Sequence, residues 1–218
     1  MLKAAFRGAI KNLKFEYEVS RNHRVGVARA RKYLGNDSLK LHLACGEVYK
    51  EGWVNIDLYP GTADICLDLR RPLPFPDNSC DEIYSEHFLE HLGYPDDAMA
   101  FLKELYRVIK PGGRVTTSVP DTEWPMKSYA EGESAQYFKI AKEKYHPKDC
   151  VTMMEHLNYH FRQNGEHLYA YDEVTLLRIL ERAGFQSNQP REFDPAMDSA
   201  SRHPGSLYVV SAKYSAGG

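Results

Sequence analysis

Histidines in two stretches of the sequence have the types and spacing that proton transfer requires. The first stretch, residues 85–91, reads SEHFLEH, and the second, residues 155–173, reads EHLNYHFRQNGEHLYAYDE and is too polar to serve packing alone. Because imidazole has an unperturbed pKa of about 6.5, it can accept the proton of a hydroxyl nucleophile at neutral pH. The candidate catalytic residues are His87, His156, His160 and His167.

A metal ion is a second use for the first stretch. His87, Glu90 and His91 can share one face at helical spacing, and imidazole and carboxylate groups both bind divalent metals. Two histidines and one glutamate lack a further partner here, however, and Leu89 and Leu92 favour packing. We therefore predict no metal site, and a structural, hydrogen-bonded role for His91.

Small and acidic residues follow the first two predicted strands. Ala44-Cys45-Gly46 carries little side chain, so its backbone can approach a ligand closely, although a tight turn is the simpler alternative. Asp57 ends the second strand, where a carboxylate can accept hydrogen bonds from both hydroxyls of a ribose or, alternatively, cap a turn. In an open α/β sheet, ligands bind at the carboxyl ends of the strands. We therefore expect a nucleoside at that edge.

Short apolar runs that alternate with helical patterns predict an open α/β sheet. The helix over 95–109 begins with a proline and two aspartates and keeps its apolar residues on one face. Another helix covers 172–183 and ends at Gly184, and two more are expected before residue 35, the second with Ser20 as its N-cap. Strands are predicted over 39–43, 54–57, 65–68, 82–85, 114–119, 191–193 and 207–214.

The net charge of the 218 residues is −2, but residues 1–38 carry +6. A basic arm can bind nucleic acid, an anionic lipid surface or a phosphorylated substrate, although a solvated helix face is the simpler alternative. Leu2, Phe6, Ile10 and Leu13 form an apolar stripe at helical spacing. The sequence has no apolar run of membrane-spanning length, no signal-peptide pattern and no CxxC pair among its four cysteines. We therefore expect a cytoplasmic protein, with at most weak membrane-surface contact through the N-terminal helix.

The ordered segments LHLACG, WVNIDL, DL, PLPFPDNSCDEIYSEHFLEHL and ELYRVIKPGGRVTTSVP resemble the S-adenosylmethionine-dependent methyltransferases of the Rossmann-like class, especially small bacterial members, over residues 39–120. The resemblance implies a mostly parallel seven-stranded sheet with helices on both faces. It also implies a helical extension over 1–38 and one methyltransferase domain over 39–218, with a substrate-side insertion over 121–171. The implied cofactor is S-adenosylmethionine, held by Ala44, Cys45, Gly46, Asp57, Leu58, Asp68, Leu69, Ser85, Glu86 and His87.

The chain departs from that family at the glycine loop. Family members have an acidic residue followed by GxGxG, whereas the positions here are His42, Ala44, Gly46 and Val48. Only seven residues separate Gly46 from Val54, too few for a helical crossover, so we expect the N-terminal helices to cover the sheet face left bare. The resemblance still implies that Gly46 faces the methionine part of the cofactor, while Asp68 accepts from the adenine amine and Leu69 packs on the ring.

The insertion over 121–171 holds nine of the 26 aromatic residues and four of the nine histidines, so we expect it to bind the acceptor. The expected function is methyl transfer to a small molecule or glycan, to oxygen and with a histidine base. The alternatives are an accessory protein that binds S-adenosylmethionine without turnover and an aminopropyl transferase on the same fold. A nucleic-acid substrate is disfavoured because no Asn/Asp-Pro-Pro-Tyr signature occurs, and a homodimer is left open.

Overall fold

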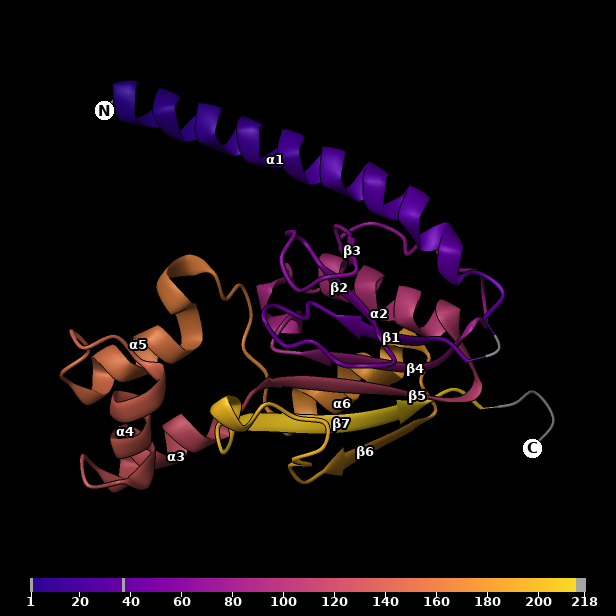
Figure 1. Ribbon diagram of the computed structural model, residues 1–218. Helices are drawn as coiled ribbons and strands as arrows, with labels where there is room; N and C mark the ends of the chain where they lie inside the picture. Colours follow the sequence, from indigo (N-terminus) through magenta and orange to yellow (C-terminus); the bar gives the residue numbers. More distant parts are fainter. Residues whose placement is uncertain (1, 37, 215–218) are drawn as a thin grey trace.

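The computed structural model describes residues 2–36 and 38–214 and contains a seven-stranded sheet (Figure 1). The strand order is β3-β2-β1-β4-β5-β7-β6, and β7 alone runs antiparallel to its neighbours. The strands are β1 (Lys40–Leu43), β2 (Val54–Asp57), β3 (Ile65–Cys66), β4 (Cys80–Glu86), β5 (Ile109–Pro120), β6 (Ser187–Arg191) and β7 (Ser206–Ala212). The mostly parallel α/β sheet expected from the sequence is confirmed.

Helices α2 (Asp96–Val108) and α6 (Glu173–Ala183) pack together on one face of the sheet. Their apolar sides join Leu41 and Ile83 of the central strands in a fully buried core. The Asp172 side chain caps α6 by accepting a hydrogen bond from the Thr175 N–H (2.7 Å), and Gly184 ends the helix at φ +112°. Both helices match the ranges predicted from the sequence to within one residue.

The opposite face of the central strands is polar and is covered by loops. Because strand side chains alternate, His42 and Tyr84 point away from the helix-covered face. The loops 44–53 and 192–205 cover them: the Lys50 ammonium lies over the Tyr84 ring and donates to the Met197 carbonyl. The expectation that N-terminal helices would cover this face is wrong, since α1 packs on β3 at the sheet edge.

The N-terminal segment forms one helix, α1 (Leu2–Ala30), followed by a 3-10 turn (Arg31–Tyr33), where two helices were expected. Neither glycine nor proline occurs between residues 9 and 25, so no residue there forces a break. Ser20 lies inside the helix, and its hydroxyl accepts a hydrogen bond from Arg71 Nη2 (2.8 Å).

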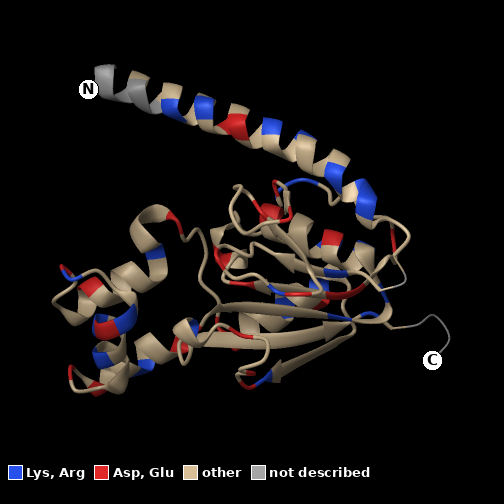
Figure 2. Cartoon of the chain, viewed as in Figure 1, with Lys and Arg blue, Asp and Glu red and all other residues tan. Residues whose placement is uncertain are grey.

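The N-terminal half of α1 projects beyond the sheet (Figure 1), and basic residues recur along the described part of the helix (Figure 2). Phe6, Ile10 and Leu13 of the expected apolar stripe are 68%, 52% and 74% exposed, and the Leu2 side chain lies outside the described residues. Within the part of the chain that the structure describes, none of the helices is long and apolar enough to cross a membrane.

Gly26 is the point where α1 meets β3. A Cβ at this position would lie 1.9 Å from the Cys66 carbonyl oxygen, so only glycine allows this approach. We expect Gly26→Ala to lower the free energy of unfolding by about 1–3 kcal/mol through overpacking, although alanine intrinsically favours a helix. Urea unfolding measures this, with Ala28→Gly on the exposed side as the control that loses about 1 kcal/mol of helix propensity. A Gly26→Ala protein as stable as the wild type would contradict the close contact.

Residues 121–171 lie at the carboxyl ends of the parallel strands (Figure 1). The segment contains α3 (Glu123–Glu131), α4 (Gln136–Ile140), a π-helical turn (Ala141–Tyr145) and α5 (Met153–Arg162). It has a small core of its own, in which Tyr137 and Phe138 are buried against Trp124 and Met153. Some of its aromatic residues therefore form the core of the segment. The segment itself lies at the carboxyl edge of the sheet, where ligands bind in α/β folds.

Candidate functional site

Asp57 holds the loop that follows β1. Leu43 of β1 pairs with Ile56 of β2, so the chain leaves β1 beside Asp57. The Gly46 N–H donates to Asp57 Oδ2 (2.9 Å), and the Tyr59 N–H donates to Oδ1 (3.2 Å). Each carboxylate oxygen keeps a lone pair for a further donor. Asp57 is thus fixed, half-buried, at the carboxyl edge of the sheet.

Two other residues expected to hold the cofactor flank this loop. Cys45 is buried, and burial raises the pKa of its thiol to about 11, so the group is neutral and suited to packing rather than to nucleophilic attack. Leu58 is half-buried directly after Asp57. Leu58 therefore offers apolar surface beside the carboxylate, whereas Cys45 packs beneath the loop.

Asp68 is paired within the protein. Its buried carboxylate accepts from Arg70 Nε (2.9 Å) and lies 3.3 Å from Arg71 Nε, and Arg70 also pairs with Glu16 of α1. Burial acts to raise the pKa of Asp68, but the hydrogen bonds from Arg70 hold it below its ordinary value. An adenine amine, the partner expected for Asp68, would therefore compete with two guanidinium groups. The adjacent Leu69 is buried.

Strand β4 brings Ser85 and Glu86 beside the glycine loop, because Leu43 also pairs with Ser85. Glu86 is 3% exposed and is bonded by the 192–205 loop: Ser199 Oγ donates to Oε2 (2.6 Å), and Arg202 Nη1 donates to the Glu86 carbonyl (2.6 Å). The carboxylate of Glu86 therefore holds this loop in place, a contact that the sequence did not indicate.

His87 follows directly, at a strained position. Its φ is +55°, a conformation that costs energy for any residue other than glycine and that is frequent at functional sites. The ring points toward the 121–171 segment, and its Nε2 lies 2.7 Å from Ser206 Oγ. Burial lowers the pKa of His87 well below its usual value, so the ring is neutral at pH 7.

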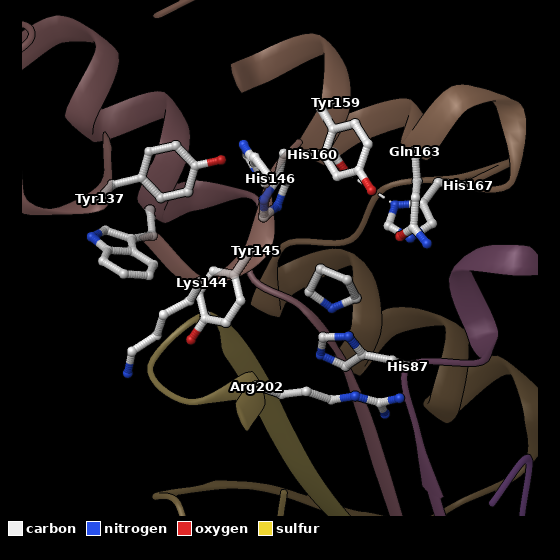
Figure 3. Close-up of a pocket in the computed structure, with 13 residues that line it drawn as sticks. His87, Tyr137, Lys144, Tyr145, His146, Tyr159, His160, Gln163, His167 and Arg202 are labelled. Carbon is white, nitrogen blue, oxygen red and sulfur yellow. Dashed lines mark hydrogen bonds between the residues drawn. The ribbon is translucent and has the colours of Figure 1, made fainter. Parts of the chain in front are cut away.

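A cavity of about 270 Å³, here called the histidine cavity, opens between the end of β4 and the 121–171 segment (Figure 3). Its volume suits one small ligand. Its wall consists of Pro120, Gly205 and the side chains of His87, Trp124, Tyr137, Lys144, Tyr145, His146, Tyr159, His160, Gln163, His167 and Arg202. Three of the four predicted catalytic histidines therefore line one cavity, although 79 residues of sequence separate His87 from His167.

The fourth candidate, His156, is buried in the 121–171 segment. Its Nδ1 lies 2.8 Å from Nδ1 of His146, and its ring contacts Phe138. Burial lowers the pKa of both histidines, to about 4 for His146, so the pair is neutral and one ring donates to the other. The structure thus places His146, which was not a candidate, in the cavity wall and His156 behind it.

The sequence and the fold match known methyltransferases. Residues 28–117 match the family model described as a methyltransferase domain. A methyltransferase from Mesorhizobium loti described as S-adenosylmethionine-dependent is 17% identical, with a TM-score of 0.50 over 84% of this chain and 95% of that one. One from Methanosarcina mazei is 19% identical, with a TM-score of 0.48 over 84% and 96%. This chain therefore contains a methyltransferase domain, which the family model matches over 90 of its 218 residues.

A methyltransferase domain on this fold supports S-adenosylmethionine as the cofactor, in agreement with the expectation from the sequence. In a sheet of this kind the ligand crevice lies outside the carboxyl ends of the strands. Asp57, Gly46 and Ser85 all lie at this edge, and His87 connects it to the histidine cavity. The individual cofactor contacts predicted from the sequence remain predictions.

Several cavity residues of the methyltransferase carry no sequence signal. Arg202 reaches the cavity from the loop before β7, and Lys144 and Tyr145 come from a π-helical turn. The aromatic residues and histidines of 121–171 pointed to part of this wall, but no sequence pattern pointed to Arg202. Two cations and several aromatic rings therefore face the same space as the histidines.

Buried neutral histidines make the methyltransferase sensitive to acid. Burial lowers the pKa of His42, which is bonded to Asn55 Oδ1 (3.0 Å), to about 4, and that of His160 to about 3. The unfolded chain, with histidine pKa values of about 6.5, binds more protons, so stability falls as the pH drops below that value. We expect urea unfolding between pH 6.5 and 5 to lose up to about 1.4 kcal/mol per pH unit for each such histidine.

His42→Gln tests this dependence, because it removes one titrating ring and keeps a polar side chain. The free energy of unfolding of the variant should fall less steeply between pH 6.5 and 5, by about the contribution of one histidine. A wild-type stability that stays flat from pH 6.5 to 5 would contradict the lowered pKa values.

Proposed function

We propose that this methyltransferase methylates a hydroxyl group of a small acceptor, such as a sugar or phenol, bound in the histidine cavity. The supporting observation is the position of the cavity at the end of β4, with His87 between it and the predicted cofactor edge. The rings of Trp124, Tyr145 and Tyr159 suit the face of a sugar or aromatic ring. Lys144 and Arg202 favour an acceptor that also carries a carboxylate or phosphate.

The reaction is an in-line displacement. An oxygen lone pair of the acceptor attacks the methyl carbon, the carbon–sulfur bond breaks toward sulfur, and S-adenosylhomocysteine leaves. The hydroxyl proton passes to a neutral ring nitrogen of His87, His160 or His167, the histidines that line the cavity. Alignment of the two reacting atoms at about 3–3.5 Å supplies much of the rate.

Transfer of a radiolabelled methyl group to a panel of phenols, hydroxy acids, monosaccharides and sugar phosphates tests the proposal. With an acceptor found, His87→Asn and His160→Asn are each assayed for kcat and for cofactor Kd. Loss of the base should lower kcat by about 100-fold or more. His160→Asn should leave the cofactor Kd nearly unchanged, because His160 is not among the residues expected to hold the cofactor. His156→Asn is the matched control, since His156 lies behind the cavity wall.

Unchanged kcat in His87→Asn, His160→Asn and His167→Asn would refute base catalysis by these residues. Cofactor binding without transfer to any acceptor would favour the accessory protein instead.

We also propose a reducing, cytoplasmic location, because the free thiols Cys45, Cys66, Cys80 and Cys150 fit such a compartment.

A further inference from the structure

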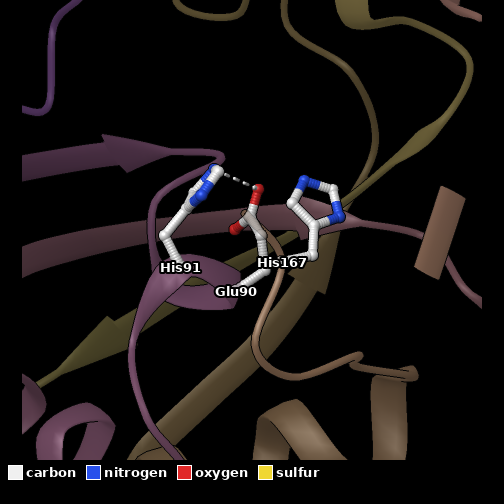
Figure 4. A group of neighbouring side chains, drawn as sticks. All are labelled: Glu90, His91 and His167. Atoms are coloured by element: carbon white, nitrogen blue, oxygen red, sulfur yellow. Dashed lines mark ion pairs between the residues drawn. The ribbon is translucent and has the colours of Figure 1, made fainter. Parts of the chain in front are cut away.

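Glu90, His91 and His167 form a cluster (Figure 4), and His167 also lines the histidine cavity. Glu90 and His91 lie on the 3-10 turn Leu89–His91 after β4, and His167 follows α5. Each residue offers one donor atom, and these atoms lie within 4.8 Å of one another. The sequence indicated no further metal ligand beside Glu90 and His91, and the fold brings His167 next to them.

The side-chain carboxyl group of Glu90 is buried without a hydrogen-bond partner among the described residues. Glu90 is 2% exposed, and neither of its oxygens has a hydrogen-bond partner within residues 2–36 and 38–214. Oε1 lies 3.8 Å from His91 Nε2 and 4.0 Å from His87 Nδ1, too far for hydrogen bonds. Burying such a group without a partner is costly, so an occupant that satisfies it would be strongly favoured.

Both histidines of the cluster are held with Nε2 free to act as a ligand. His91 Nδ1 lies 3.0 Å from the Glu166 carbonyl oxygen, and His167 Nδ1 lies 2.9 Å from the His160 carbonyl oxygen. A carbonyl oxygen only accepts hydrogen bonds, so each Nδ1 carries the proton and each neutral ring has its lone pair on Nε2. Metal-binding histidines are commonly oriented by such a hydrogen bond to the other ring nitrogen.

A second void adjoins the cluster. A cavity of about 10 Å³ is lined by Glu90, His160 and His167 among others, and this is room for one atom-sized occupant. His160 Nε2 is also buried without a hydrogen-bond partner among the described residues. Donor atoms around a tetrahedral zinc ion lie ~3.3 Å apart, so shifts of about 1 Å in the side chains would bring the three donors to that spacing.

We propose that Glu90, His91 and His167 bind a divalent transition-metal ion, of the Zn²⁺, Co²⁺ or Mn²⁺ kind. Two imidazole nitrogens and one carboxylate favour such ions over Mg²⁺ and Ca²⁺, which prefer oxygen ligands. Three protein ligands leave a coordination position for a water or a substrate oxygen. His87 and His160 are the neighbouring donors on the cavity side.

The site deepens the proposed function, and only its role in catalysis rests on that function. With an ion bound to its Nε2, His167 is a ligand and not the base, so the hydroxyl proton would pass to His87 or His160. An ion there would bind an oxygen of the acceptor in the adjoining cavity, which His167 also lines, and would lower the pKa of a bound hydroxyl. Metal binding itself needs no acceptor and no methyl transfer. A binding experiment therefore succeeds or fails independently of the proposed reaction.

The test uses the full chain, stripped with a chelator and titrated with Co²⁺ while its visible absorption is recorded. We expect one Co²⁺ per chain, displacement by Zn²⁺, and a metal-dependent rise in Tm. Glu90→Gln and His167→Asn should each weaken binding by about 100-fold or more. Glu166→Gln, the same chemical change at an exposed neighbour, should bind as the wild type does.

Three results would overturn the proposal. One is the absence of stoichiometric Co²⁺ or Zn²⁺ binding by the folded wild type. Another is unchanged affinity in Glu90→Gln, with circular dichroism showing that the variant is folded. A third is binding of Mg²⁺ as tight as that of Zn²⁺, which would not fit two imidazole ligands.

Discussion

Asp57→Ala is expected to weaken S-adenosylmethionine binding by at least about 100-fold. The carboxylate lies at the carboxyl end of β2, where both of its oxygens can accept from the ribose hydroxyls, and a hydrogen bond to a charged group contributes about 1.5–3 kcal/mol. The variant also releases the Gly46 N–H from Oδ2 and so loosens the glycine loop. Calorimetry with S-adenosylmethionine and with S-adenosylhomocysteine measures the effect.

Asp57→Asn separates the two contributions, since it keeps an acceptor oxygen and loses the charge. Asp57→Asn should bind S-adenosylmethionine about tenfold more weakly than the wild type. Asp77→Ala, which removes a 71% exposed side chain paired with Arg107, is the control that leaves the cofactor Kd unchanged. An Asp57→Ala protein that binds the cofactor as tightly as the wild type would remove Asp57 from the cofactor site.

Asp198→Ala is expected to lower the free energy of unfolding by about 3–5 kcal/mol. The Asp198 side chain is fully buried and pairs bidentately with Arg191 (2.6 Å to each oxygen). It also accepts from Tyr84 Oη (3.0 Å) and from the Asp194 N–H (2.7 Å). Its removal would leave a guanidinium group and a buried phenol without their partner, which costs more than the lost pair itself contributes.

Asp194→Ala is the matched control in the same loop. Asp194 is half-buried, and its Oδ1 accepts from the Ala196 N–H (2.9 Å), so we expect a loss of about 1 kcal/mol. Urea unfolding compares the two variants. Because the loop also carries Ser199 and Arg202 to Glu86, Asp198→Ala should weaken cofactor binding as well. Equal stability of the two variants would contradict the role of Asp198.

The sequence predicted the elements whose signals are local. Asp172 and Gly184 set the ends of α6 through neighbouring backbone groups, and Asp96 and Asp97 favour the positive N-terminal end of α2, so these positions follow from a few residues. Six of the seven predicted strands coincide with observed strands for the same reason. The strand predicted over 191–193 was misplaced and meets β6 only at Arg191, because β6 (Ser187–Arg191) has the sequence SNQPR and therefore no apolar run. The break expected at Ser20 was wrong, because a good N-cap residue does not end a helix whose backbone hydrogen bonds continue.

Asp57 at a strand end, the histidine-rich insertion and the methyltransferase class could be recognised from residue order alone. The tertiary structure decided what those residues meet: Arg70 and Arg71 around Asp68, Ser199 against Glu86, and His167 beside Glu90. These partners lie far apart along the chain or depend on loop packing, and side-chain type alone does not encode such contacts. Local chemistry therefore specified the sheet and its carboxyl edge, whereas long-range packing specified the cavity and its buried charges.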